Sequence, residues 1–314
     1  SRSGFALSLP LGLGCSRLGS VLGPGEDGAR ALIATALDHG ITFFDTATIY
    51  AQGDSERLLG RVLGKRRDCV ICSKVGQHLP VPGPALLPIK RLARIAAARS
   101  PVARRAVARA RAQPLPRIWT TSFLSEAVEA SLRRLDREQV EIMLLHGPPA
   151  SVLAEGMAVG TLEAAHRSGK IGLIGVSVDD VPAAFAALAD ERVRVLQIPL
   201  LPGEIEFEPV IERARREGVA IIAREVFGGP RAISGEIQPE GFAASRVAEL
   251  TTRVDLAVTL VGTTNERHLR EAVAAALCAG EDSLRPASLV SPAPYRELLR
   301  VRFAPSLACF KNGS

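Results

Sequence analysis

The fold is decided by one stretch near the start of the chain, Gly40-Ile41-Thr42-Phe43-Phe44-Asp45-Thr46-Ala47-Thr48-Ile49-Tyr50. The apolar run that ends at Phe44 has the length and the aromatic and β-branched content of a buried strand. Asp45 comes at the point where this strand would leave the core, and Tyr50 follows a few residues later. A buried strand with polar residues at its end is typical of a parallel sheet, in which one rim carries the functional site.

Two later apolar runs end in the same way. Residues 70–73 lead to Lys74, and residues 142–145 lead to His146. Each polar residue taken alone is more often a turn, packing or solvated residue than a functional one. Because the carboxyl ends of parallel strands meet at one rim of a barrel, we expect all four side chains to converge there. An acid, a phenol, an amine and an imidazole placed together can donate a proton to a carbonyl oxygen.

Apolar runs alternate with helical segments over most of the chain. We expect strands at 11–15, 41–45, 69–74, 141–146, 172–176, 195–198, 219–223 and 258–261. Helical periodicity predicts helices near 28–39, 55–63, 122–135, 157–168, 182–189, 208–217, 242–250 and 267–279. This alternation favours parallel strands joined by right-handed crossovers. We predict a single-domain α/β protein, a (β/α)8 TIM barrel over 1–314, with an insertion after the third strand at about 77–121 and a tail at about 280–314.

The competing fold is a doubly wound open sheet, whose fingerprint is a Gly-rich turn that runs from the first strand into a helix. Gly12-Leu13-Gly14 is the candidate here, but it lacks a third glycine and a long loop follows it. The sequence therefore favours the barrel.

The composition is that of a globular protein with a sizeable core. The chain has 314 residues, of which 47% are apolar. No uncharged apolar run approaches the ~20 residues that a membrane-spanning helix needs. The first residues lack the apolar core and cleavage pattern of a signal peptide. We therefore expect a cytoplasmic protein that is not held in a membrane.

The cysteines and histidines do not predict a disulfide framework or a metal site. Cys69 and Cys72 have the spacing of a redox or zinc half-motif, but they fall within an expected strand, where residues three apart point to opposite faces. We expect both to be buried thiols. The five histidines show no ligand spacing, so no bound metal is expected.

The insertion carries the positive charge of the chain. It contains no Asp or Glu from Gln77 to Trp119, and nine basic residues lie between 90 and 117. Without these nine charges the net charge of +6 becomes about −3. The insertion is either a solvated helical lid or a lid whose Arg104, Arg105 and Arg109 attract an anionic substrate or cofactor phosphates. A nucleic-acid or membrane surface is the third reading, which prolines without interleaved aromatics disfavour.

These motifs together resemble the aldo-keto reductase family. The most specific match is the block from 40 to 60, and further matches follow at 73–76, 131–135, 144–146, 169–172, 175–177 and 261–265. The resemblance covers nearly all of residues 5–280. It implies an eight-stranded α/β barrel that reduces aldehydes and ketones with NADPH or NADH, and a catalytic tetrad made of Asp45, Tyr50, Lys74 and His146.

The chemistry of these residue types supports those roles. A free tyrosine has a pKa near ~10, and a nearby ammonium favours the phenolate. We expect Lys74 to lower the pKa of Tyr50, Asp45 to hold Lys74, and His146 to orient the carbonyl oxygen. Tyr50 then acts as the general acid, while the cofactor supplies the hydride.

The resemblance also implies a cofactor site. It assigns to cofactor binding Gly14, Asp45, Ser177, Gln197, Arg224, Gly262, Thr263, Thr264 and His268. Ser177 and Gln197 match positions that hydrogen-bond the nicotinamide amide. Residues 262–265 lead into a helix whose backbone amides suit a phosphate. Arg267 and His268 could meet a 2′-phosphate, which favours NADPH, with NADH as the alternative.

The sequence departs from the family pattern at three cofactor positions. Val178 replaces an Asn, Ala272 replaces another Asn, and Arg224 occupies the position of a Tyr that stacks on the nicotinamide ring. Arg224 either stacks in its place or turns toward Glu225 or another structural acid.

We therefore interpret the chain as an NAD(P)H-dependent oxidoreductase that reduces a small-molecule aldehyde or ketone to an alcohol. The substrate class extends to anionic carbonyl compounds, and no nucleic-acid partner is expected. A related reading is an enzyme that works mainly as a dehydrogenase. The alternative from another class is a nucleotide-binding regulatory or sensor protein with little turnover. The tail, with Tyr295, Phe303 and Phe310, is expected to line or cover the pocket.

Overall fold

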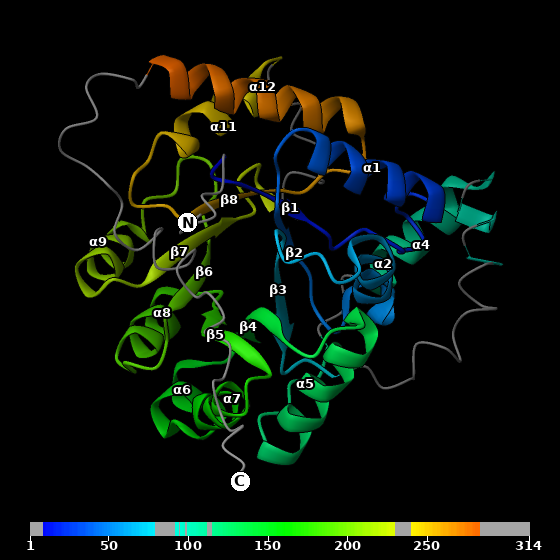
Figure 1. Cartoon of the computed structure of the whole chain (residues 1–314). Coiled ribbons are helices and arrows are strands. Elements are labelled where there is room, and N and C mark those ends of the chain that lie inside the picture. Colours follow the sequence, from blue (N-terminus) through cyan, green and yellow to red (C-terminus); the bar gives the residue numbers. More distant parts are fainter. Residues whose placement is uncertain are drawn as a thin grey trace, which may run out of the picture.

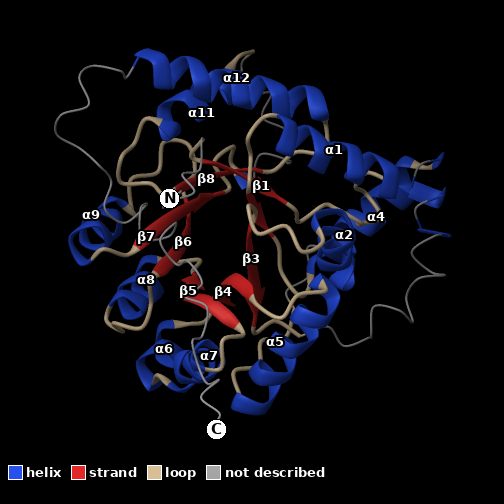
Figure 2. Cartoon of the chain, in the orientation of Figure 1, coloured by secondary structure: helices blue, strands red, loops and turns tan. Residues whose placement is uncertain are grey.

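The architecture is a closed barrel of parallel strands. The computed structural model describes residues 9–78, 92–93, 95–97, 99–111, 115–229 and 240–282. In this part of the chain eight strands close into a barrel in sequence order, with β8 paired to β1 (Figure 2). The strands are β1 Leu11–Gly14, β2 Phe43–Asp45, β3 Val70–Val75, β4 Val140–His146, β5 Ile171–Ser177, β6 Val195–Pro199, β7 Ala220–Arg224 and β8 Val258–Val261. The predicted (β/α)8 TIM barrel is confirmed, and each strand lies within two residues of its expected bounds.

Helices surround the barrel (Figure 1). They are α1 Glu26–Asp38, α2 Asp54–Leu63, α4 Pro101–Arg111, α5 Thr121–Leu135, α6 Ala150–Glu155, α7 Met157–Arg167, α8 Val181–Leu188, α9 Glu208–Glu217, α11 Phe242–Thr251 and α12 Glu266–Asp282. Local signals fix several ends: Asp180 caps α8 by accepting a hydrogen bond from the Ala183 amide at 2.8 Å, and Gly218 ends α9 in the left-handed conformation. The short helix α6 was not expected from the sequence.

The core has two parts, because the strand residues point alternately into the barrel and toward the helices. Phe43, Cys72, Ile142 and Leu144 belong to the cluster inside the barrel. Cys69 belongs to the larger cluster that contacts the helices. The prediction that both cysteines are buried and point to opposite sides is confirmed. The interior is filled, since a side chain on Gly12 would come within 2.8 Å of Leu260 and Phe43. The barrel is therefore a packed support and not a pore.

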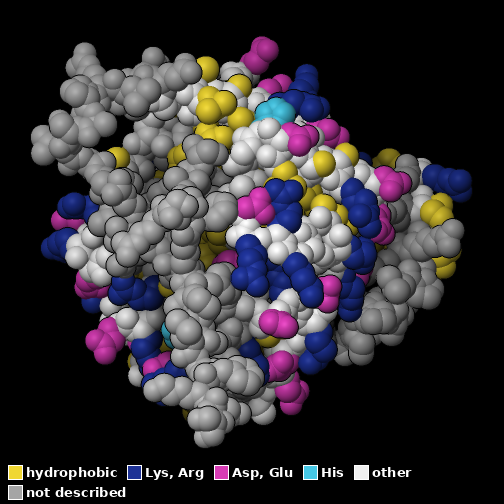
Figure 3. Space-filling view, viewed as in Figure 1, with side chains coloured by type: hydrophobic (Ala, Val, Ile, Leu, Met, Phe, Trp, Pro, Cys, Tyr) yellow, Lys and Arg dark blue, Asp and Glu magenta, His cyan; other side chains and the backbone are white. Residues whose placement is uncertain are grey.

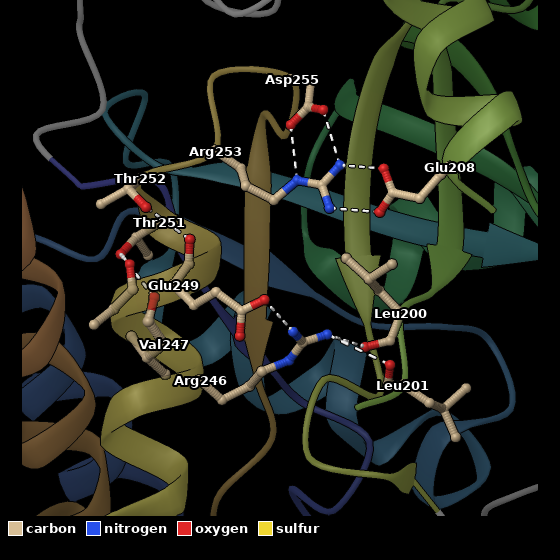
Figure 4. Close-up of polar contacts among 11 residues, drawn as sticks. Leu200, Leu201, Glu208, Arg246, Val247, Glu249, Thr251, Thr252, Arg253 and Asp255 are labelled. Carbon is tan, nitrogen blue, oxygen red and sulfur yellow. Dashed lines mark hydrogen bonds and ion pairs between the residues drawn. The ribbon is translucent and has the colours of Figure 1, made fainter. Parts of the chain in front are cut away.

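Two arginines tie α11 and the segment after it to neighbouring parts of the barrel (Figure 4). Arg246 donates to the backbone carbonyls of Leu200 and Leu201, which follow β6. Arg253 lies between two carboxylates and pairs with Glu208 at 2.6 Å and Asp255 at 2.8 Å. These contacts hold the outer layer of helices against the loop that follows β6.

The segment that leaves β3 and the segment that returns to α5 run antiparallel and are joined by backbone hydrogen bonds. The Ile118 amide donates to the Gly76 carbonyl, and the His78 amide donates to the Pro116 carbonyl, each at 2.8 Å. Gly76 has a φ of +114°, and a Cβ there would lie 2.2 Å from the ring of Trp119. The stem of the insertion is therefore packed at the end of β3, at the rim where the sequence analysis placed it.

Within the insertion, α4 lies at the outer edge of the molecule and not over the ring of strands (Figure 1). Arg104, Arg105 and Arg109 are exposed, as expected for a solvated helix. On the face shown in Figure 3, Lys and Arg side chains are interspersed with Asp and Glu. The attraction of an anionic ligand to these three arginines stays a prediction.

Other expectations fall outside the described residues. They concern the tail from 283 on, which includes Tyr295, Phe303 and Phe310. Among the helices that the structure describes, none is long and apolar enough to cross a membrane.

The contact between Gly76 and Trp119 gives a test of how the insertion is anchored. Gly76→Ala should lower the free energy of unfolding by about 2–4 kcal/mol, because it adds both backbone strain and a clash with the ring. Chemical denaturation measures this loss. Gly218→Ala is the matched control: its φ is +69°, none of the residues that the structure describes has an atom within 4 Å of the new Cβ, and the change should cost only about 1 kcal/mol. Equal losses in the two variants would contradict the packing described here.

Candidate active site

The predicted site residues lie at one end of the barrel. Asp45, His146, Ser177, Arg224 and Gly14 are the last residues of β2, β4, β5, β7 and β1. Lys74 is the last but one residue of β3, Gln197 lies within β6, and Gly262 directly follows β8. The carboxyl ends of all eight strands thus contribute to the same rim. In barrels of this kind this is the end at which chemistry takes place.

A buried ion pair forms the base of the site. The ammonium of Lys74 lies 2.6 Å and 2.7 Å from the two carboxylate oxygens of Asp45, and it also donates to the Thr46 carbonyl at 2.9 Å. Lys74 is 1% exposed and Asp45 is 4% exposed. Burial by itself would lower the pKa of Lys74, but the charges of Asp45 and Tyr50 outweigh it and raise that pKa above its ordinary value. Lys74 is therefore a permanent cation, held in place by Asp45.

A hydrogen-bonded chain extends this pair across the barrel. The Gln197 amide donates to Asp45 Oδ1 at 2.7 Å, and the Ser177 hydroxyl donates to Gln197 Oε1 at 2.9 Å. Ser177 and Gln197 lie opposite each other in the register of β5 and β6, and both are buried. The sequence analysis assigned these two residues to the nicotinamide amide and did not expect the link to Asp45. The sequence signal that could have indicated this link is that two consecutive strands, which pair in the barrel, carry the polar residues Ser177 and Gln197 at or near their ends.

Tyr50 lies above the ion pair at the start of the short helical turn η1 Tyr50–Gly53. The Lys74 ammonium is 5.0 Å from the centre of its ring. The ring of His146 meets that of Tyr50 edge-on, with centroids 6.0 Å apart and planes at 88°. Ala51 and Gln52, the next two residues, both have positive φ angles, which is strained for residues other than glycine. The chain therefore turns sharply behind Tyr50 and leaves its ring against Lys74 and His146.

The pKa of Tyr50 is raised, whereas the sequence analysis expected Lys74 to lower it. Burial raises the pKa of Tyr50 above its ordinary value, and the attraction of Lys74 for the phenolate offsets this only in part. The predicted effect of Lys74 is present, but desolvation is larger. In the absence of further ligands Tyr50 is therefore a fully protonated phenol at neutral pH.

His146 is a neutral imidazole. Burial, followed by the positive charges of Lys74, Arg224 and Arg117, lowers the pKa of His146 well below its ordinary value. Its Nδ1 is buried and has no hydrogen-bond partner among the described residues. If Nε2 carries the proton, Nδ1 is an unprotonated acceptor and no donor is left buried without a partner. Nε2, which carries the proton, is then the nitrogen that can meet a substrate.

A cluster of charges that sequence reasoning did not find lies beside His146. Arg117, from the end of the insertion, donates to the carbonyl of Gly147 and pairs with Asp179 at 3.1 Å. Arg224 pairs with the same Asp179 at 2.6 Å, with Glu225, and with the carbonyl of Val178 at 2.8 Å. Of the two alternatives for Arg224, the structure shows the one in which it turns toward structural acids.

The end of β8 is open, as a phosphate site requires. A Cβ at Gly262 would meet no atom of the described residues within 4 Å, and Gly14 abuts Gly262. Asn265 caps the start of α12 by accepting a hydrogen bond from the Arg267 amide at 2.9 Å. His268 is exposed on the first turn of α12. Thr263 and Thr264, the remaining predicted residues, lie in the same turn, half-buried, whereas Ala272 is buried in the core.

Removal of Lys74 tests whether the ion pair is as buried as described. Lys74→Met should lower the free energy of unfolding by about 3–5 kcal/mol, because it leaves the Asp45 carboxylate buried without a cation. Denaturant titration measures this change. The double variant Lys74→Met/Asp45→Asn should recover most of the loss, since it removes the uncompensated charge as well. A single variant as stable as the wild type would show that the pair is exposed to water.

Known proteins are similar to this chain in sequence and in fold. The model of the aldo/keto reductase family matches residues 10–244. A 6-dehydroglucose reductase from Novosphingobium aromaticivorans is 30% identical over 246 residues, which are 74% of this chain and 69% of that protein. A structure from Pseudomonas aeruginosa, described as a candidate aldo-keto reductase, has 27% identity and a TM-score of 0.67, covering 88% of this chain and 94% of its own.

A more distant structure has the same fold. An aldo-keto reductase from Klebsiella pneumoniae, solved in complex with NADPH, has 18% identity and a TM-score of 0.60, and the match covers 93% of this chain and 99% of that one. The family match spans well over half of the residues, and a relative at 30% identity extends over about three quarters of them. The chain therefore belongs to the aldo/keto reductase family.

Proposed function

We propose that this protein is an NADPH-dependent reductase that converts a small-molecule aldehyde or ketone to an alcohol. The observation that supports this most strongly is the position of the Tyr50 phenol between the buried Lys74–Asp45 pair and the imidazole of His146. A protonated phenol beside a fixed cation and a neutral hydrogen-bond donor is suited to protonating a carbonyl oxygen.

The residues of the rim fit a nicotinamide dinucleotide. The open turn at Gly262, with Thr263 and the exposed His268 beside it, would hold phosphate groups at the start of α12. Ser177 and Gln197 would bind the nicotinamide amide, exchanging their mutual hydrogen bond for bonds to it. Val178 is buried and offers no polar contact there. The bound cofactor would supply the hydride. The NADPH in the Klebsiella pneumoniae relative supports the choice of NADPH, with NADH as the alternative.

The side chains of this protein divide the remaining work. His146, kept neutral by its surroundings, would donate an N–H to the carbonyl oxygen and hold it near the phenol of Tyr50. Tyr50 would then give its proton to the developing alkoxide. The ammonium of Lys74 lies close enough to stabilise the phenolate that this leaves, and Asp45 keeps the ammonium from moving. Since Lys74 and Asp45 are buried, this stabilisation is little screened by solvent.

The pH profile of reduction should be flat over a wide range. The pKa of His146 lies below its ordinary 6.5, so the imidazole stays neutral as the pH falls through that value. The pKa of Tyr50 lies above its ordinary 10, so the phenol keeps its proton in alkaline solution. We expect kcat/KM for an aldehyde, measured at saturating NADPH, to be constant from about pH 6.5 to 10. An acid limb with its midpoint at or above 6.5 that disappears in His146→Gln would contradict the neutral imidazole.

Replacement of the Tyr50 hydroxyl tests the proposed general acid. Tyr50→Phe should reduce kcat for a reactive aldehyde at least about a hundredfold, because the proton donor is lost while the ring remains. The affinity for NADPH, followed by fluorescence titration, should change little. Loss of both activity and cofactor affinity would mean that Tyr50 is structural.

The wild-type protein also separates the two function classes. Oxidation of bound NADPH by a reactive aldehyde supports the reductase. Tight binding of NADPH without oxidation by any reactive aldehyde would instead favour the regulatory or sensor protein.

A further inference from the structure

The guanidinium groups of Arg117 and Arg224 share the carboxylate of Asp179. These residues lie at the rim that carries the proposed active site, and this part of the rim is called the mouth below. Asp179 Oδ1 lies 2.6 Å from Arg224 Nη2, and Asp179 Oδ2 lies 3.1 Å from Arg117 Nη2. The two arginines come from different parts of the chain, one at the end of β7 and one at the end of the insertion. Asp179 therefore joins two segments of the rim that are far apart in the sequence.

The group formed by Asp179, Arg117 and Arg224, called the bracket below, is adjacent to His146, the residue that would orient the substrate. Arg117 donates to the carbonyl of Gly147, the residue after His146. A Cβ on Gly147 would lie 3.1 Å from both the Arg117 guanidinium and the Asp179 carboxylate, so glycine is needed for this close approach. Ser177, two residues before Asp179, pairs with His146 in the register of β4 and β5. A substrate whose carbonyl oxygen meets His146 would thus place its other groups near the bracket.

The bracket is accessible but electrically balanced. The side chain of Asp179 is 53% exposed, that of Arg117 is 42% exposed and that of Arg224 is 17% exposed. Glu225 also pairs with Arg224, so two guanidinium groups face two carboxylates. Beneath them, the charge of Lys74 is balanced by Asp45. Among the described residues of this part of the rim the formal charges thus balance, and these residues offer hydrogen-bond donors and acceptors without a net charge that would select an anion.

We propose that Asp179 determines which charge of substrate the protein prefers. By neutralising Arg117 and Arg224 it makes the mouth select neutral carbonyl compounds over anionic ones. Hydroxyl or amide groups of such a substrate can donate to Asp179 and accept from Arg117, whereas a carboxylate would have to compete with Asp179 for the same guanidinium groups. This assignment rests on the proposed reductase function. It also differs from an attraction of anions by Arg104, Arg105 and Arg109, which lie on α4 at the outer edge of the molecule (Figure 1).

The test compares two aldehydes of the same size and different charge, para-formylbenzamide and para-formylbenzoate. The readout is the ratio of their kcat/KM values at saturating NADPH, which cancels effects on the cofactor and on the shared chemistry. The wild type should prefer the amide. Asp179→Asn should shift the ratio toward the benzoate by about tenfold, because it removes the negative charge that both guanidinium groups share beside the carbonyl site. Arg117→Gln should shift the ratio in the opposite direction.

Glu129→Gln is the matched control, because it also removes one carboxylate from an ion pair, with Lys170, away from the mouth. It should leave the ratio within about twofold of the wild type, as expected when exposed charges lie beyond the screening length. Thermal unfolding shows which variants are folded. If Asp179→Asn does not fold, the opposite shift in Arg117→Gln still decides the matter.

The outcomes separate the two proposals. A wild type that prefers the benzoate, or folded Asp179→Asn and Arg117→Gln variants that reduce both aldehydes with an unchanged ratio, would overturn the role of Asp179 and leave the reductase function intact. A shift of the same size in Glu129→Gln would overturn it as well. If the wild type reduces neither of these two aldehydes nor any other reactive aldehyde, the proposed function fails and the role of Asp179 fails with it.

Discussion

The pairing of Lys74 with Asp45 inside the barrel is the interaction on which the site depends. Two buried charges are tolerable only when each satisfies the other, and here the ammonium contacts both carboxylate oxygens. This requirement fixes the ends of β2 and β3 relative to each other. Gln197 also donates to Asp45 Oδ1 and extends the constraint to β6. Tyr50 rests against a cation that cannot move away, so its phenol is in place before any ligand arrives.

Different parts of the molecule provide its packed core and the charges that a substrate would meet. The interior of the barrel is packed with apolar side chains, and the proposed catalytic groups lie at the ends of its strands. The charges that a substrate would meet first come from loops: Arg117 from the insertion, Asp179 from the segment after β5, and Glu225 from the segment after β7. Loops supported by a rigid scaffold can change their side chains without affecting the core. The mouth is therefore the part of this protein in which its substrate preference would be encoded.

The sequence predicted the barrel and the position of the tetrad because both follow from short-range patterns. Buried runs such as 142–145 mark the strands, and the polar residue that ends each run must lie at the common rim. The contacts that could not be predicted join residues far apart in the chain. Arg117 and Asp179 meet only because the insertion returns to the rim beside β3. The direction of the Tyr50 pKa also depends on a balance between burial and the charge of Lys74, and burial is a property of the folded molecule.

The most direct test of the account is whether this protein transfers hydride to a carbonyl carbon. The purified protein is incubated with a reactive aldehyde and NADPH that carries deuterium in place of both hydrogens at C4 of the nicotinamide ring, and the product alcohol is examined by mass spectrometry. The account predicts one deuterium on the former carbonyl carbon, in proportion to the NADPH oxidised. NADPH that binds but leaves the aldehyde unreduced, or an alcohol without deuterium, would contradict it.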